Sequence, residues 1–195
     1  MKPQRNQIKK SSLREWVESA LFAFILFLII RTFVVQAFKI PTGSMRPTLK
    51  EGDMLLVTKF WYGAQIPFTD IRLPGLSKPQ RGDVIVFLYP VDKKRDFIKR
   101  LIGESGETIE IKNGKIYADD KVVDDAKISS RFYYNRGDYG EEGKKIYVPP
   151  DSYFVLGDNS SSSYDSRYWG FVPKKYLVGR AFIIYWPLNR IRLIK

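Results

Sequence analysis

The apolar residues of this chain form one long N-terminal run followed by many short runs. Residues 20–30 read ALFAFILFLII, without a polar interruption. Extending the run to Trp16 and Val35 gives 20 residues, with Glu18 and Arg31 near its ends. Twenty helical residues span about 30 Å, the thickness of a bilayer core. The run therefore predicts a membrane-spanning helix.

A cleaved secretory signal sequence is the alternative interpretation of the same run. Residues 35–37 read VQA, which suits a cleavage site, but Arg31 separates the apolar run from them and favours an uncleaved anchor. Residues 1–15 carry five basic side chains and one acidic side chain. A basic leader of this kind predicts a cytoplasmic N-terminus, with everything after residue 37 on the other side of the membrane.

Beyond residue 38 the apolar runs are short, rich in β-branched and aromatic residues, and separated by Pro and Gly, which predicts strands. The expected strands are residues 53–59, 83–88, 97–102, 108–112, 115–118, 153–156 and 178–186. Asn113-Gly114 is a strong signal for a two-residue hairpin. Residues 124–145 are polar and glycine-containing, which predicts a loop-rich insertion. The expected fold class is mainly β.

Composition narrows the chemistry. The chain has no histidine and no cysteine, which excludes imidazole bases, thiol nucleophiles, disulfides and thiolate zinc sites. Lysine, tyrosine or a carboxylate must then move protons in any hydrolase. The net charge of +12 makes nucleic acid one candidate partner. Beyond the N-terminus, however, the basic residues are interspersed with acids and follow no RNA- or DNA-binding motif, which favours anionic lipid head groups.

The first candidate for chemistry is the segment 40–49, IPTGSMRPTL. Gly43 removes a side chain beside Ser44 and lets another backbone approach. If the segment is extended, Thr42 and Ser44 project to the same side, where the Thr42 hydroxyl is placed to stabilise an oxyanion beside a serine nucleophile. An ordinary Pro/Gly/Ser turn after a membrane anchor is the alternative.

The second candidate is a lysine in an apolar strand. Alternation places Phe97, Lys99 and Leu101 on one face of the strand. Burial disfavours an ammonium ion and lowers the pKa of a lysine, so Lys99 is a candidate general base for a serine. Alternatively, its stem covers apolar surface and its head reaches water.

The third candidate is the loop 157–170, GDNSSSSYDSRYWG, which follows an apolar strand. Asp165 and Arg167 are placed to form an ion pair that fixes the loop, and Asp158 is a second possible partner for Arg167. A serine-rich surface turn is the alternative.

Taken together and in order, these segments resemble the bacterial type I signal peptidases, the membrane-bound leader peptidases. PTGSMRPTL is similar to the family's nucleophile box and GDMLLVTK to the strand after it. RGDVIVF with DFIKR is similar to the base box, and GDN…DSRYWG to the final box. Four ordered boxes behind an N-terminal apolar run form a specific pattern.

The resemblance implies a signal-peptidase-like β catalytic core with an inserted β-rich subdomain, preceded by one transmembrane helix. The expected organisation is a basic cytoplasmic tail (1–15), an anchor (16–37), the first part of the core (38–107), the insertion (108–149) and the second part of the core (150–195). The chain is expected to cross the bacterial cytoplasmic membrane once, with its catalytic domain outside the cytoplasm.

The resemblance also implies roles for residues. Ser44 is the expected nucleophile and Lys99 the general base. The Ser44 backbone N–H and the Thr42 hydroxyl form the expected oxyanion hole, Ser163 orients Lys99, and Met45 packs beside the nucleophile near the substrate. Asp158, Asp165 and Arg167 support the site.

The implied substrates are secretory preproteins, delivered by the translocation machinery and cut after small residues at −1 and −3 through an acyl-enzyme. The implied partners include membrane lipids but no nucleic acid, and no cofactor or metal is implied.

Three points stay open at the level of sequence. Ser160 and Ser161 replace the arginine and the acidic or amide residue usual in the family, so any of residues 160–163 is a candidate contact for Lys99. The aromatic residues 60–62 and Trp186 suit either the core or the membrane interface. A membrane-tethered β scaffold is a rival function. A self-cleaving repressor-type Ser-Lys protease is a second rival, disfavoured by the anchor and by the lack of a helix-turn-helix pattern.

Overall fold

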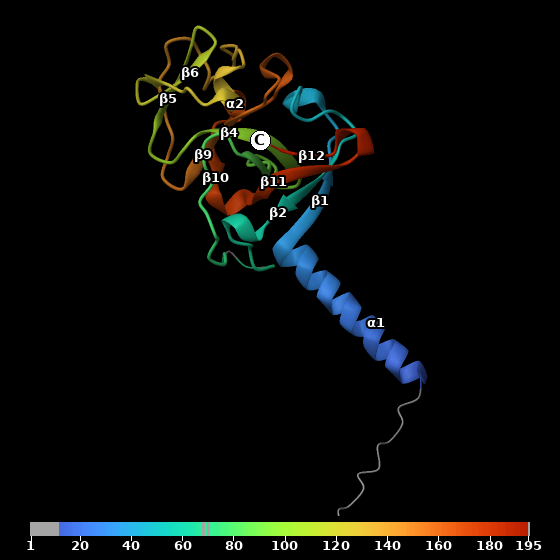
Figure 1. The fold of residues 1–195 in the computed structure, drawn as a ribbon. Coiled ribbons are helices and arrows are strands. Elements are labelled where there is room, and N and C mark those ends of the chain that lie inside the picture. Colours follow the sequence, from blue (N-terminus) through green and yellow to red (C-terminus); the bar gives the residue numbers. More distant parts are fainter. Residues whose placement is uncertain (1–11, 68, 70, 195) are drawn as a thin grey trace, which may run out of the picture.

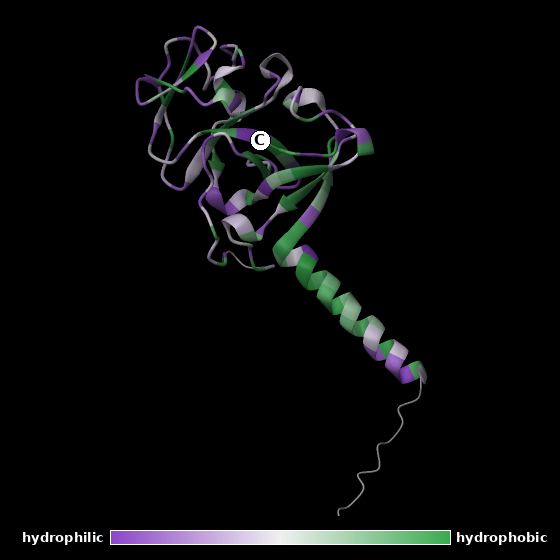
Figure 2. Ribbon diagram, viewed as in Figure 1, coloured by the Kyte–Doolittle hydropathy of each residue, from purple (hydrophilic) through white to green (hydrophobic). Residues whose placement is uncertain are grey.

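The computed structural model describes residues 12–67, 69 and 71–194. It begins with a long helix, α1 (Ser12–Ile29), which a π-helical turn, η1 (Ile30–Val34), extends. Together they form a 23-residue segment long and apolar enough to cross a membrane, and none of it is buried within the protein. In Figures 1 and 2 this apolar rod projects from the β body of the molecule. Because a soluble core helix would bury its apolar face, this exposure supports a membrane-spanning role.

The helix passes directly into the sheet. Strand β1 (Val35–Lys39) begins immediately after η1, so the last three residues of the expected anchor, 35–37, belong to the sheet instead. At the other end, residues 12–15 of the expected tail begin α1. The basic leader up to residue 11 lies outside the described residues.

The larger sheet is antiparallel and has eight strands in the spatial order β1-β2-β11-β3-β4-β9-β10, with β12 paired to β11. The strands after β1 are β2 (Met54–Thr58), β3 (Val84–Leu88), β4 (Asp96–Gly103), β9 (Ser152–Leu156), β10 (Val172–Pro173), β11 (Leu177–Trp186) and β12 (Arg192–Leu193). The register shifts between Leu101 and Gly103, where β4 pairs with β9.

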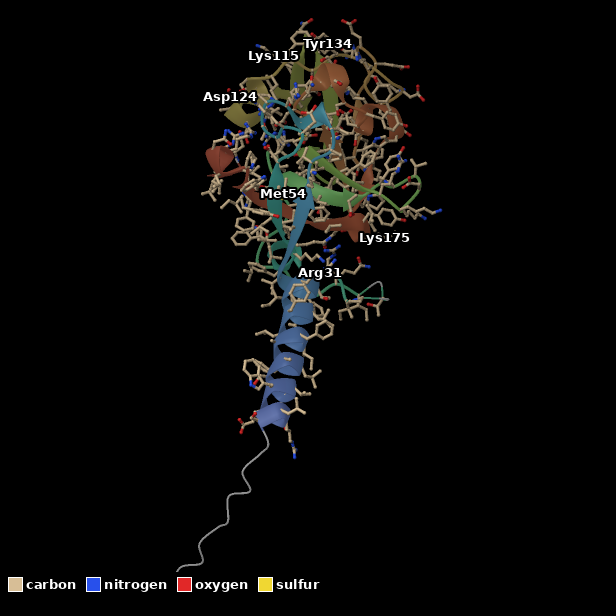
Figure 3. The ribbon with its side chains drawn as sticks, turned by 90° about the vertical axis from the view of Figure 1, so that its right-hand side faces the viewer. Arg31, Met54, Lys115, Asp124, Tyr134 and Lys175 are labelled. Carbon is tan, nitrogen blue, oxygen red and sulfur yellow. The ribbon has the colours of Figure 1, made fainter. Side chains whose placement is uncertain are left out.

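The part of the chain that connects β4 to β9 forms a second, four-stranded sheet in the order β7-β6-β5-β8. Its strands are β5 (Thr108–Lys112), β6 (Lys115–Ala118), β7 (Lys121–Val122) and β8 (Ile146–Tyr147). Asn113 and Gly114, with φ of 51° and 72°, make the expected hairpin turn between β5 and β6. Figure 3 shows Lys115 and Tyr134 at one end of the β body and Arg31 at its opposite end, where α1 joins it.

The helices outside the anchor are short. They are α2 (Ala126–Ser129), α3 (Ser166–Trp169) and the 3₁₀ turns η2 (Gly43–Met45), η3 (Phe60–Tyr62), η4 (Ser160–Ser162), η5 (Lys174–Tyr176) and η6 (Leu188–Arg190). The fold class predicted from sequence, mainly β after one apolar helix, is confirmed.

The apolar core has three clusters. One lies between the two sheets and includes Ile102, Ile109 and Phe154; the other two contain side chains of the larger sheet. The structure also separates the aromatic residues that the sequence left open, since Tyr62 is buried in the core whereas Phe60 and Trp186 are exposed.

Candidate active site

Ser44 lies on the single 3₁₀ turn η2 in the connection between β1 and β2. Thr42 is extended, but the chain turns at Gly43, so the segment is not extended through Ser44 as the sequence suggested. Buried Ile40 and Leu49 fasten the two ends of this connection in the core. The nucleophile candidate thus sits on a fixed turn rather than on a free loop.

Lys99 lies on β4, which pairs with β3 on one side and with β9 on the other. Its side chain is almost fully buried, at 5% exposure. Lys99 Nζ lies 2.8 Å from Ser44 Oγ and 3.0 Å from the carbonyl oxygen of Ile98. Because 55 residues separate Ser44 from Lys99 in the chain, the fold creates this contact.

Burial lowers the pKa of Lys99 from 10.5 to about 8, because the apolar surroundings disfavour the ammonium ion. The carboxylates of Asp165 and Asp158 oppose this lowering, and the Arg167 guanidinium adds to it. A lysine with such a pKa holds a usable fraction of neutral amine near neutral pH. Lys99 therefore combines hydrogen-bonding distance to a hydroxyl with the pKa that a general base needs.

A cavity of about 250 Å³ opens beside the two side chains. It is lined by Pro41, Thr42, Ser44, Asp96, Phe97, Ile98, Lys99, Ser162 and Tyr164. This volume lies below the 300–1,000 Å³ or so of ordinary small-molecule sites. The cavity suits short side chains of a longer substrate.

Comparison with known families gives this geometry a context. The family model described as "Signal peptidase, peptidase S26" matches residues 13–186, which include all of α1 but its first residue, and also Ser44, Lys99 and the loop after β9. The chain belongs to the signal peptidase I family, peptidase S26. It is accordingly a serine endopeptidase of a membrane-associated family.

Several curated relatives are similar to this signal peptidase along most of its length. "Probable signal peptidase I-2" of Synechocystis is 39% identical, covering 95% of this chain and 81% of the relative. "Signal peptidase I P" of Bacillus subtilis subsp. natto is 37% identical and covers 96% of both chains. "Signal peptidase I" of Pseudomonas aeruginosa is 33% identical, covering 92% and 75% respectively.

In this signal peptidase, the loop after β9 holds the nucleophile turn through backbone contacts. The Asn159 N–H donates to the Ser44 carbonyl oxygen at 3.0 Å, and Asn159 Nδ2 donates to the Gly43 carbonyl oxygen at 3.1 Å. Gly157 permits the close approach, because a Cβ there would lie 2.5 Å from the Ser44 carbonyl oxygen and 2.2 Å from Ser163 Oγ. Sequence reasoning missed Asn159, although the GDN motif was a visible signal.

The ion pair between Asp165 and Arg167 is present and fully buried. Arg167 Nε and Nη2 donate to the Asp165 carboxylate at 2.8 and 2.9 Å. Arg167 also donates to Ser160 Oγ at 2.8 Å, so Ser160 points toward this arginine and not toward Lys99. A buried guanidinium with this many acceptors fixes the loop in one conformation.

Asp158 is not a partner of Arg167. Its carboxylate is fully buried and accepts hydrogen bonds from Arg100 Nε and Nη2, each at 2.7 Å. Arg131 Nη2 lies 3.1 Å from Asp158 Oδ2. The sequence-based pairing was wrong because Arg100, next to Lys99 on β4, points to the opposite face and reaches Asp158 first. An arginine in an apolar strand was a signal for this pair, since a buried guanidinium needs a carboxylate.

Ser163 and Met45 have surroundings that differ from those that the sequence predicted. Ser163 Oγ is buried and has no hydrogen-bond partner among the described residues, so the expected bond to Lys99 is not formed here. Met45 is fully buried in the core and does not line the cavity. Met45 therefore packs the nucleophile turn against the core rather than facing a substrate. Thr42 is exposed and lines the cavity together with Ser44.

Proposed function

We propose that this signal peptidase removes signal peptides from secretory preproteins with Ser44 as nucleophile and Lys99 as general base. The observation that carries the proposal is the 2.8 Å contact between Lys99 Nζ and Ser44 Oγ at the edge of the small cavity. The chain has no histidine that could replace Lys99.

The proposed reaction proceeds through an acyl-enzyme. Neutral Lys99 accepts the hydroxyl proton as Ser44 Oγ attacks the scissile carbonyl carbon. The protonated lysine then donates that proton to the leaving amine as the peptide bond breaks. In the second step Lys99 accepts a proton from the water that attacks the ester carbon. It then returns that proton to Ser44 Oγ as the ester C–O bond breaks and the product carboxylate leaves.

The oxyanion of the tetrahedral intermediate is held, in this proposal, by the Ser44 backbone N–H and the Thr42 hydroxyl. Thr42 lines the same cavity as Ser44, on the segment immediately before the nucleophile turn. Donors placed before the reaction stabilise the developing charge without reorganising.

Replacing Thr42 with alanine should lower kcat by about 10²–10³-fold without abolishing cleavage, because one of two oxyanion donors is lost. Thr42→Ser keeps the hydroxyl and should remain close to wild type. Steady-state kinetics with a synthetic signal-peptide substrate provide the measurement. Equal kcat values for Thr42→Ala and Thr42→Ser would remove Thr42 from the oxyanion hole.

Ser163 is proposed to orient Lys99 when a substrate is bound. Its Oγ is buried and has no hydrogen-bond partner among the described residues. Like the Ser44 carbonyl oxygen, it lies against Gly157. A buried hydroxyl without a partner costs free energy unless it serves another purpose. In this proposal, Lys99 exchanges its hydrogen bond to the Ile98 carbonyl oxygen for one to the Ser163 hydroxyl.

The proposed substrates carry small residues at −1 and −3 of the cut. The small cavity, walled by Pro41, Phe97 and Ile98, supports a preference for short side chains. The apolar helix supports anchoring in the cytoplasmic membrane of a bacterium, in contact with its lipids. The basic leader supports a cytoplasmic N-terminus, with the site outside the cytoplasm, where the translocation machinery delivers preproteins.

Covalent labelling tests the nucleophile directly. A serine-directed acylating inhibitor should add once to the detergent-solubilised protein, and peptide mapping by mass spectrometry should place the adduct on Ser44. Ser162→Ala, which removes another serine lining the same cavity, should label normally. Labelling of any other serine, or of the Ser44→Ala variant, would contradict the proposal.

A further inference from the structure

One connection of the inserted subdomain lies against the loop after β9, residues 157–170, which we call the catalytic loop. This connection, residues 131–140, follows α2 and precedes β8. The Tyr134 N–H donates to Ser160 Oγ at 2.9 Å, and Arg167 Nη1 donates to the Tyr134 carbonyl oxygen at 2.8 Å. The Tyr139 N–H donates to the Arg167 carbonyl oxygen at 2.8 Å. The insertion is thus bonded to the part of the chain that supports the site.

Arg131, at the start of this connection, contacts both segments that flank the site. Its side chain is only 15% exposed. Arg131 Nη2 donates to Thr48 Oγ1 at 2.9 Å and lies 3.1 Å from Asp158 Oδ2. Thr48 Oγ1 in turn donates to Asp158 Oδ2. One guanidinium therefore joins the segment after the nucleophile to the start of the catalytic loop.

Both of these segments control the position of Ser44. Thr48 follows Ser44 by four residues, and the intervening Met45 carbonyl oxygen accepts from the Leu49 N–H at 2.8 Å. Asp158 precedes Asn159, whose two bonds hold the nucleophile turn. A change in the distance between Thr48 and Asp158 is therefore transmitted to the turn from both sides.

We propose that Arg131 is a positioning residue for the nucleophile: from the inserted subdomain, it fixes the spacing between the Ser44 segment and the catalytic loop. The inference rests on the proposed role of Ser44 as nucleophile. Through Arg131 the insertion helps to set the position of Ser44. This matters for the rate, because a misplacement of about 1 Å at reacting atoms costs up to about 10²-fold.

The charge balance separates positioning from folding. Asp158 keeps its two bonds to Arg100 when Arg131 is removed, so no unpaired carboxylate is left in the core. Thr48 also keeps Asp158 as its acceptor. The expected loss is therefore the spacing that Arg131 imposes, and not the stability of the buried ion pair.

The test is a kinetic double-mutant cycle of Arg131→Met and Thr48→Val in the full-length, detergent-solubilised protein. Arg131→Met should lower kcat by about 10–100-fold and change KM less than threefold. Because both residues act through one network, the double variant should lose far less activity than the product of the two single losses. Arg131→Lys retains the positive charge and one donor nitrogen, so it should recover part of kcat.

Arg180→Met is the matched control. Arg180 also lies 3.1 Å from a buried carboxylate, that of Asp83, which keeps its bond from the Tyr62 hydroxyl. This control should leave kcat unchanged, and thermal unfolding should show all variants folded.

The outcomes separate two failures. A wild-type kcat for folded Arg131→Met, or fully multiplicative losses in the cycle, would overturn the positioning role. If Arg131→Met proves unfolded, the same double-mutant cycle is measured with Arg131→Lys and Thr48→Val. Fully multiplicative losses of kcat in that cycle would likewise overturn the positioning role. Cleavage by Ser44→Ala, measured in the same assay, would instead overturn the proposed nucleophile.

Discussion

Replacing Ser44 with alanine is expected to reduce cleavage of a model preprotein by at least about 10⁴-fold, the scale on which serine proteases depend on their nucleophile. The variant loses Oγ, which lies 2.8 Å from Lys99 Nζ. The fold should be retained, because the 3₁₀ turn is fixed by the backbone and side-chain N–H groups of Asn159 and by the buried Met45.

Ser162→Ala is the matched control for this loss, since Ser162 lines the cavity but lies on a different 3₁₀ turn, η4. It should cleave at close to the wild-type rate. A gel assay of preprotein processing in detergent is sufficient. Processing by Ser44→Ala at a rate similar to that of Ser162→Ala would show that another group forms the acyl-enzyme.

Replacing Lys99 with methionine is expected to have the second large effect, again at least about 10⁴-fold in kcat/KM. Methionine has a similar length and no charge to bury, so the apolar environment between β3 and β9 should accept it without a cavity. The hydroxyl of Ser44 then has no base within hydrogen-bonding distance. Lys115→Met, an exposed change on β6, should leave cleavage unchanged.

The pH dependence of the wild-type enzyme reports on the same group. The lysine is active when neutral, so kcat/KM should rise with pH and level off above the pKa of about 8. Below that pKa the rate should fall about tenfold for each pH unit. A profile that stays flat between pH 6 and 9 would contradict a lysine base, and residual activity in Lys99→Met should lack this rise.

Local sequence signals accounted for much of the fold. The hairpin at Asn113-Gly114 was predicted with both strands at the observed bounds, because its turn geometry is encoded in two adjacent residues. The alternation around Lys99 likewise identified a lysine in apolar surroundings. The long helix followed from composition alone, although hydropathy did not mark where η1 gives way to β1.

Contacts between distant segments could not be predicted in the same way. The choice of Asp158 between Arg167 and Arg100 depends on which arginine the fold brings close, and both are plausible from sequence. Arg131 lies in a polar, irregular stretch with no periodicity to indicate its direction. Its contacts with Thr48 and Asp158 exist only because the insertion folds back onto the core.

The junction between helix and sheet sets the height at which this enzyme works. The π turn enters β1 without a linker, and Lys59, the residue after β2, holds it in place. The Lys59 N–H donates to the Val34 carbonyl oxygen at 2.9 Å, and Lys59 Nζ donates to the Arg31 carbonyl oxygen at 3.2 Å. Strand β1 leads directly to the turn that carries Ser44. The anchor and the sheet together are therefore expected to fix the distance of Ser44 from the membrane surface. We expect a substrate held in the same bilayer to present its scissile bond to Ser44 only if its own apolar segment ends at a matching distance from that bond.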